Sequence, residues 1–125
     1  RGSAQYRIST LAASETILYL DGSSEKFSIS SGDHYSCRIH LIGAQADGST
    51  GDYYAIVKIK NVSGTTSLSG TVRVLEAWEG DTNLGTPTIS ITADDANDCL
   101  QIAVTPANAT ATRWTAVIEY VKINY

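Results

Sequence analysis

The sequence predicts a single all-β domain spanning residues 1–125, folded as an antiparallel two-sheet β-sandwich of jelly-roll-like form with eight or nine strands. Short runs that alternate apolar or β-branched residues with polar ones recur from end to end, and each stops at turn-forming Gly, Asp, Asn, Ser or Thr. The chain is 42% hydrophobic and 18% charged, with seven Tyr and no Met, a composition that suits pleated, half-buried strands. No segment shows a convincing helical period.

The expected strands begin with a hairpin, in which residues 17–20 and 27–29 flank the turn residues 21–24. A second, longer hairpin is expected where the polar, Gly-rich segment 47–52 joins two long runs. In order, the expected strands cover residues 6–12, 16–21, 25–30, 35–46, 53–62, 68–77, 88–93, 100–105 and 113–123.

Strand alternation also predicts which side chains form the core, because successive residues point to opposite faces. The expected core positions are Tyr35, Ile39, Leu41, Val57, Ile59, Leu100, Ile102 and Val104. Cys37 is in phase with this set and is expected to point inward. Cys99 is out of phase with Leu100 and is expected to point outward, so both cysteines are expected to be free thiols.

Two of the expected strands carry apolar residues on both faces. Tyr54 and Ile56 lie on the side that should face water, and 113–123 carries large apolar side chains in both phases. A strand of this kind is either central in a sandwich and covered by a loop, or part of a contact with another copy of the chain. We expect self-association through Tyr54, Ile56, Trp114, Ile118 and Tyr120.

Several classes of function are disfavoured by the sequence. A formal charge of −4 argues against nucleic acid as a partner, and no run has the apolar length of a membrane span. His34 and His40 would lie roughly 20 Å apart along one strand, too far to share a metal ion. The Asp clusters near residues 47 and 94 fit turns better than a calcium loop.

No catalytic motif is recognisable either. There is no nucleophile motif or phosphate-binding loop, and Glu76 and Glu79 have no spacing that fixes a glycosidase pair. We therefore expect neither an enzyme nor a cofactor site.

Trp78 is the most conspicuous candidate for ligand contact, because it stands where a strand gives way to the polar loop that contains Asn83. An indole at such a boundary can offer its flat face to a sugar ring, while amides and carboxylates nearby form hydrogen bonds. The alternative is that Trp78 folds back and covers the core.

Short motifs distributed along the chain carry a resemblance to a known family. They are Ala4-Gln5, YLDGSS at 19–24, FSI at 27–29, DYYA at 52–55, LQIAVT at 100–105 and TRWTAVIE at 112–119. In this order they resemble a β-sandwich domain found near the ends of tailed-bacteriophage tail-fibre and related virion proteins. The resemblance implies a module of a virion appendage, assembled in the host cytoplasm, trimeric, and in contact with a glycan or protein of the bacterial surface.

Loops of such a module are the expected place for host contact, because they vary without disturbing the core. The candidate contacts are Trp78, Asn83, Asp47 and Asp52. Two alternatives stay open: a trimerisation or decoration module without a ligand, and a carbohydrate-binding module attached to a secreted enzyme.

Overall fold

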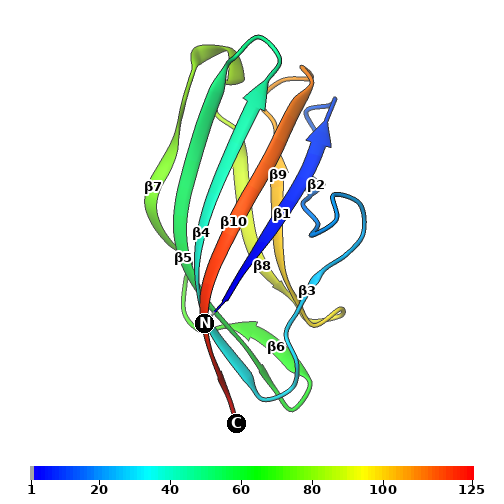
Figure 1. The fold of residues 1–125 in the computed structure, drawn as a ribbon, viewed down its shortest axis with the longest axis vertical. Coiled ribbons are helices and arrows are strands. Elements are labelled where there is room, and N and C mark those ends of the chain that lie inside the picture. Colours follow the sequence, from blue (N-terminus) through cyan, green and yellow to red (C-terminus); the bar gives the residue numbers. More distant parts are fainter. Residues whose placement is uncertain (1) are drawn as a thin grey trace.

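A computed structural model describes residues 2–125 and shows ten β-strands packed as two antiparallel sheets (Figure 1). The strands are β1 (Gly2–Thr10), β2 (Thr16–Ile17), β3 (Phe27–Ser28), β4 (Asp33–Gln45), β5 (Thr50–Val62), β6 (Thr65–Leu68), β7 (Arg73–Gly80), β8 (Thr88–Asp94), β9 (Cys99–Thr105) and β10 (Thr112–Asn124). The helical content of the described chain is one 3₁₀ turn at Thr82–Leu84, and no helix in it is long and apolar enough to cross a membrane. The predicted sandwich is confirmed.

The larger sheet, sheet A, has the strand order β1-β10-β4-β5-β6, and β7 also pairs with β5. In the smaller sheet B, β9 pairs along its whole length with β8, while β2 and β3 pair with two separate parts of it. Figure 1 shows the turn between β4 and β5 at one end of the sandwich, the upper end, and both chain termini at the other, the lower end.

The core lies between the sheets and is built as the alternation predicts. All eight predicted core positions are buried, as is Cys37. The Tyr6 hydroxyl crosses from sheet A to donate a hydrogen bond to the Leu100 carbonyl of sheet B at 2.7 Å. Burial of that phenol raises the pKa of Tyr6, which therefore stays a neutral donor.

The expected hairpin over residues 17–29 is wrong. β2 and β3 pair with β9 instead of with each other, and each contributes only two residues. The intervening loop is held by Asp21, whose Oδ1 accepts hydrogen bonds from the backbone N–H groups of Ser23, Ser24 and Glu25 at 2.8–2.9 Å. This Asx turn satisfies the backbone locally, so a strand ladder is unnecessary there.

The expected strand over residues 68–77 is also wrong, because the chain bends after Leu68 and splits it into β6 and β7. Gly70, at φ +83°, lies in this bend in a left-handed conformation that suits glycine. Bulges between Asp52 and Ala55 then distort the pairing of β7 with β5.

Two expectations about single side chains need correction. Cys99 has the predicted phase, but it is only 2% exposed; Asp94, the last residue of β8, pairs with it, and the Asp94 carboxylate lies against its thiol. Burial raises the pKa of Cys37 to about 12 and that of Cys99 to about 11. Within the described chain both are free thiols.

The second correction concerns β10. Trp114 and Ile118 are 1% and 0% exposed and cannot form a surface contact, while Tyr120 is in phase with them and packs its half-buried ring against the core. The surface-facing side chains of β10 are in the opposite phase. Val117, Val121 and Ile123 are 43%, 59% and 62% exposed, while Tyr54 and Ile56 are half-buried on the same outer face of sheet A.

Candidate ligand-binding surface

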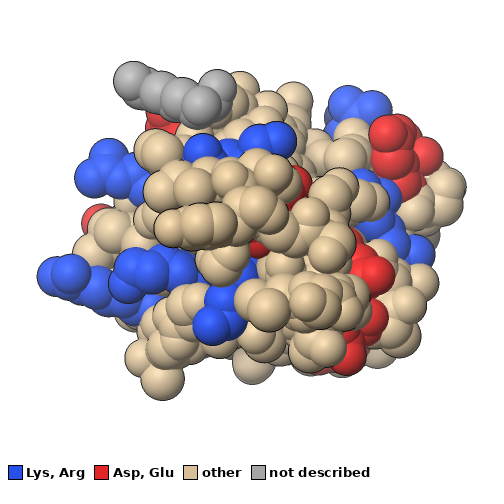
Figure 2. Space-filling view, turned by 90° about the horizontal axis from the view of Figure 1, so that it is seen from below, with Lys and Arg blue, Asp and Glu red and all other residues tan. Residues whose placement is uncertain are grey.

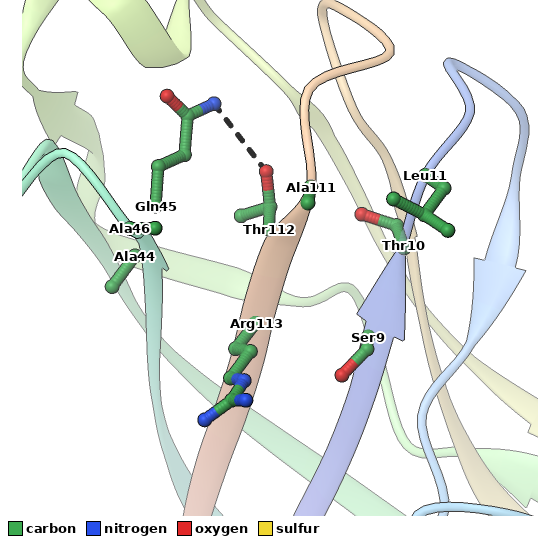
Figure 3. Close-up of a pocket in the computed structure, with 9 residues that line it drawn as sticks. All are labelled: Ser9, Thr10, Leu11, Ala44, Gln45, Ala46, Ala111, Thr112 and Arg113. Carbon is green, nitrogen blue, oxygen red and sulfur yellow. Dashed lines mark hydrogen bonds between the residues drawn. The ribbon is translucent and has the colours of Figure 1, made fainter.

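An open hollow of about 620 Å³ lies at the upper end of sheet A (Figure 3). We call it the upper hollow; it is formed where β1 and β4 end and β10 begins. Its lining is Ser9, Thr10, Leu11, Ala44, Gln45, Ala46, Ala111, Thr112 and Arg113. The surface is mostly apolar, with Arg113 as its one charged lining side chain.

The three strand ends around the upper hollow are fixed by buried hydrogen bonds. Figure 3 shows the Gln45 side chain of β4 donating to the Thr112 hydroxyl of β10, at 3.4 Å. The Trp114 indole N–H of β10 donates to the Thr10 hydroxyl of β1 at 2.9 Å. Because buried polar contacts restrain their neighbours, the hollow has a rigid floor.

Loops beside the upper hollow are joined through Asn83. Its side-chain amide donates to Asp47 Oδ2 at 3.2 Å, and its backbone carbonyl oxygen accepts from the Asn108 side chain at 2.9 Å. Asp47 also caps the backbone N–H of Ser49, and this hydrogen bond lowers the pKa of the Asp47 carboxyl. The structure thus brings together Asp47 and Asn83, two of the four candidate ligand contacts.

Asp52 lies elsewhere, on the outer face of sheet A. Its Oδ2 is 3.0 Å from His40 Nε2, and this contact lowers the pKa of Asp52. Glu76 lies on the neighbouring strand β7, opposite Tyr54, where hydrogen bonding with the Asp52 carboxylate and the Asp52 charge raise the pKa of Glu76. The Tyr54 ring packs beside His40 with centroids 5.2 Å apart.

Trp78 folds back over the core, which is the alternative that the sequence left open. Its ring lies 5.7 Å from that of Trp114, and a Cβ added at Gly51 would stand 2.3 Å from Cζ2 of the Trp78 indole. The indole nitrogen is buried and has no hydrogen-bond partner among the described residues. Trp78 therefore belongs to the packing of the sandwich and lies outside the upper hollow.

The lower half of the outer face has a different character. A smaller hollow there, of about 280 Å³, is lined in part by His34, Lys58, Lys60, Val121 and Ile123. Seen from below, several Lys and Arg side chains gather at the left of the view, and the right side carries both Lys or Arg and Asp or Glu (Figure 2). Basic side chains thus accompany the exposed apolar ones on this half of the sheet.

No metal centre is evident in the part of the chain that the structure describes. No group of three His, Cys, Asp or Glu side chains there is placed to hold an ion. The Asp94 cluster is a turn, in which Asp94 accepts hydrogen bonds from the backbone and side chain of Asn97.

The upper hollow itself was missed at the level of sequence. Its apolar members Leu11, Ala44, Ala46 and Ala111 occupy exposed or half-buried positions at strand ends; the first three fall inside the strands expected over 6–12 and 35–46, and Ala111 just before the one expected over 113–123. Small apolar residues in the solvent phase of three strands were the available signal. What joins them is the β1-β10-β4 order, which the sequence does not show.

Comparison with known proteins gives one structural likeness to report. No family model and no curated protein matches the sequence. Among solved structures, the chain is similar to part of the tailspike protein of Acinetobacter phage vB_ApiP_P1, with 14% sequence identity and a TM-score of 0.37. The match covers 90% of this chain and 22% of the tailspike chain, so the chain spans about a fifth of the length of that protein.

Proposed function

We propose that this chain is a noncatalytic module of a bacteriophage tail fibre or similar virion appendage, and that its upper end binds a glycan or protein of the bacterial surface. The family resemblance of the sequence motifs supports the virion setting. The upper hollow supports the binding role and is the observation that carries it.

The geometry of the upper end favours recognition over catalysis. The hollow is open, mostly apolar and built on three rigid strand ends, with the hydrogen-bonded Asp47 and Asn83 loops beside it. Apolar surface with a few placed polar groups is typical of binding sites. Both chain termini lie at the opposite end, so the hollow faces away from them (Figure 1).

We propose that three copies associate in the virion and contact the host together. The exposed apolar side chains Val121 and Ile123 offer a contact on the lower half of the outer face, away from the upper hollow, and Val117 extends it to the middle of β10. Covering this half would leave the upper end open to a receptor. The number three comes from the family resemblance.

Retention of the purified, labelled chain on cells to which the parent particle adsorbs tests the proposed function. Ala111→Trp fills the upper hollow from an exposed position and should reduce retention by about tenfold or more. Thr92→Trp, at an exposed position on β8 of sheet B, is the matched control and should bind like the unmodified chain.

Two outcomes would overturn the receptor-binding role. One is the absence of retention on those cells, which would favour the trimerisation or decoration module. The other is equal retention of the Ala111→Trp and Thr92→Trp variants, which would place any contact outside the upper hollow.

A further inference from the structure

Two arginines stand close together beside the upper hollow. Arg7 on β1 is opposite Thr115 on β10, and Ser9 is opposite Arg113, so both arginines occupy the outer face of neighbouring strands. Residues offset by two positions across such a pair are within reach of long side chains. Like charges placed in this way repel unless an anion lies between them.

Neither arginine has a carboxylate partner in the described structure. The ion pairs found there are His40 with Asp52 and Lys122 with Asp33. Two unpaired arginines are unexpected in a chain that has 13 Asp and Glu but only 9 Lys and Arg. The two guanidinium groups therefore keep their donors free for a ligand.

Asp21 is a carboxylate beside this pair, and it already accepts hydrogen bonds within its own loop. It lines a second hollow of about 320 Å³ with both arginines, but its Oδ1 accepts three backbone N–H groups of its own loop. Those hydrogen bonds lower the pKa of Asp21, so it stays ionised and partly offsets the two positive charges. The balance in this hollow is still positive.

The two hollows meet, because Ser9 and Arg113 line both of them. One side offers guanidinium groups and the hydroxyls of Ser9 and Thr115. The other offers the apolar side chains of Leu11, Ala44, Ala46 and Ala111. In Figure 3, the side chains of Ser9 and Arg113 lie on the neighbouring strands β1 and β10, below the apolar upper rim.

We propose that this joint surface binds an acidic sugar, with its carboxylate or phosphate held by Arg7 and Arg113 and its acetyl group or ring face placed in the upper hollow. Guanidinium groups bind both oxyanions through paired hydrogen bonds. The apolar side then distinguishes an acidic sugar from a bare anion. This inference rests on the proposed function and names the chemical class of its receptor.

Titration of the ¹⁵N-labelled chain, followed by amide chemical shifts, tests the site with four probes. They are N-acetylneuraminic acid, which carries a carboxylate; N-acetylglucosamine 6-phosphate; neutral N-acetylglucosamine; and inorganic phosphate. We expect at least one acidic sugar to shift the amides of Ser9, Ala44 and Arg113, and to bind more tightly than the neutral sugar. Whichever acidic sugar binds identifies the oxyanion.

Matched variants separate the two halves of the site. Arg7→Gln and Arg113→Gln should each weaken binding of the acidic sugar by about tenfold, whereas Arg73→Gln, an exposed arginine on β7, should leave it unchanged. Ala111→Trp should weaken acidic-sugar binding and leave any binding of inorganic phosphate intact. Unchanged amide spectra away from the hollows establish that each variant is folded.

The inference fails if no acidic sugar shifts these amides, if the neutral sugar binds equally well, or if Arg73→Gln weakens binding as much as Arg113→Gln does. Failure of the proposed function has a different signature. Acidic-sugar binding that depends on Arg113 would persist, but the labelled chain would not be retained on cells.

Discussion

Gly51 and Trp78 are packed so closely that the residue at position 51 has no room for a side chain. A Cβ there would stand 2.3 Å from the indole and 2.9 Å from the Glu79 carbonyl oxygen. We predict that Gly51→Ala lowers the free energy of unfolding by about 1–3 kcal/mol, because the added methyl group overpacks this site. Urea unfolding measures the difference.

A double-mutant cycle checks the cause of that loss. In a Trp78→Ala background the Gly51→Ala penalty should be smaller, because only the contact with the Glu79 carbonyl remains. An equal penalty in both backgrounds would mean that the indole is not the group being displaced.

The pKa values of two carboxyls on the outer face, Asp52 and Glu76, should be shifted apart. Asp52 should titrate below its ordinary range because His40 hydrogen-bonds it, and Glu76 above its own because the Asp52 carboxylate beside it favours the protonated form of Glu76. His40→Ala removes a hydrogen bond to Asp52 and should raise the pKa of Asp52. Carboxyl carbon shifts followed by NMR measure each pKa, and an unchanged Asp52 value in the variant would contradict the assignment.

The shifted pKa values of Asp52 and Glu76 stabilise the fold over opposite ranges of pH. The lowered pKa of Asp52 stabilises the fold above the ordinary aspartate pKa, and this contribution is lost as pH falls through the lowered value. The raised pKa of Glu76 stabilises the fold at low pH, and that contribution is lost as pH rises through the raised value.

Alternation along β4 gives a test at the level of one element. Ile39 is fully buried and Ile42, three residues on, is 44% exposed. We predict that Ile39→Ala costs about 2–5 kcal/mol through lost burial and the cavity left behind. Ile42→Ala is the control, with an expected cost within about 0.5 kcal/mol. Similar losses for the two variants would show that the faces of β4 are assigned wrongly.

The elements that the sequence predicted well are those with long, regular alternation. β4, β5, β9 and β10 lie close to their expected ranges because a period of two over many residues fixes both strand and face. β2 and β3 could not be bounded, since their pairing depends on β9, more than 70 residues away. The phase of Cys99 was predicted but its burial was not, because the Asp94 carboxylate that lies against its thiol comes from the pairing of β8 with β9.

The candidate site was less predictable than the fold. Asp47 and Asn83 were recognised as loop residues, but their hydrogen bond joins positions 36 residues apart. The direction of the Trp78 indole follows from the space that Gly51 leaves open, which is a property of two strands together. Arg7 and Arg113 become neighbours only through the pairing of β1 with β10.

For the whole molecule, the exposed side chains of β10 predict association. We expect light scattering coupled to size exclusion to give about three times the chain mass of 13.3 kDa, because burying Val117, Val121 and Ile123 between copies removes apolar surface from water. Val121→Glu should shift the mass to that of one copy. Thr92→Glu, on sheet B, is the control and should not. A monomer at micromolar concentration for the unmodified chain would contradict the trimer.

The position of β10 between β1 and β4 also sets the order in which the chain can fold. Sheet A is continuous only after the last strand has inserted between the first strand and the middle of the chain. On a ribosome, β1 would therefore emerge early and wait without a ladder partner until residues 112–124 appear. Pairings this distant in sequence fold slowly, in about milliseconds to seconds. The two backbone hydrogen bonds that Arg7 exchanges with Tyr19 cover the other edge of β1, so the edge that receives β10 stays open to another chain during that interval.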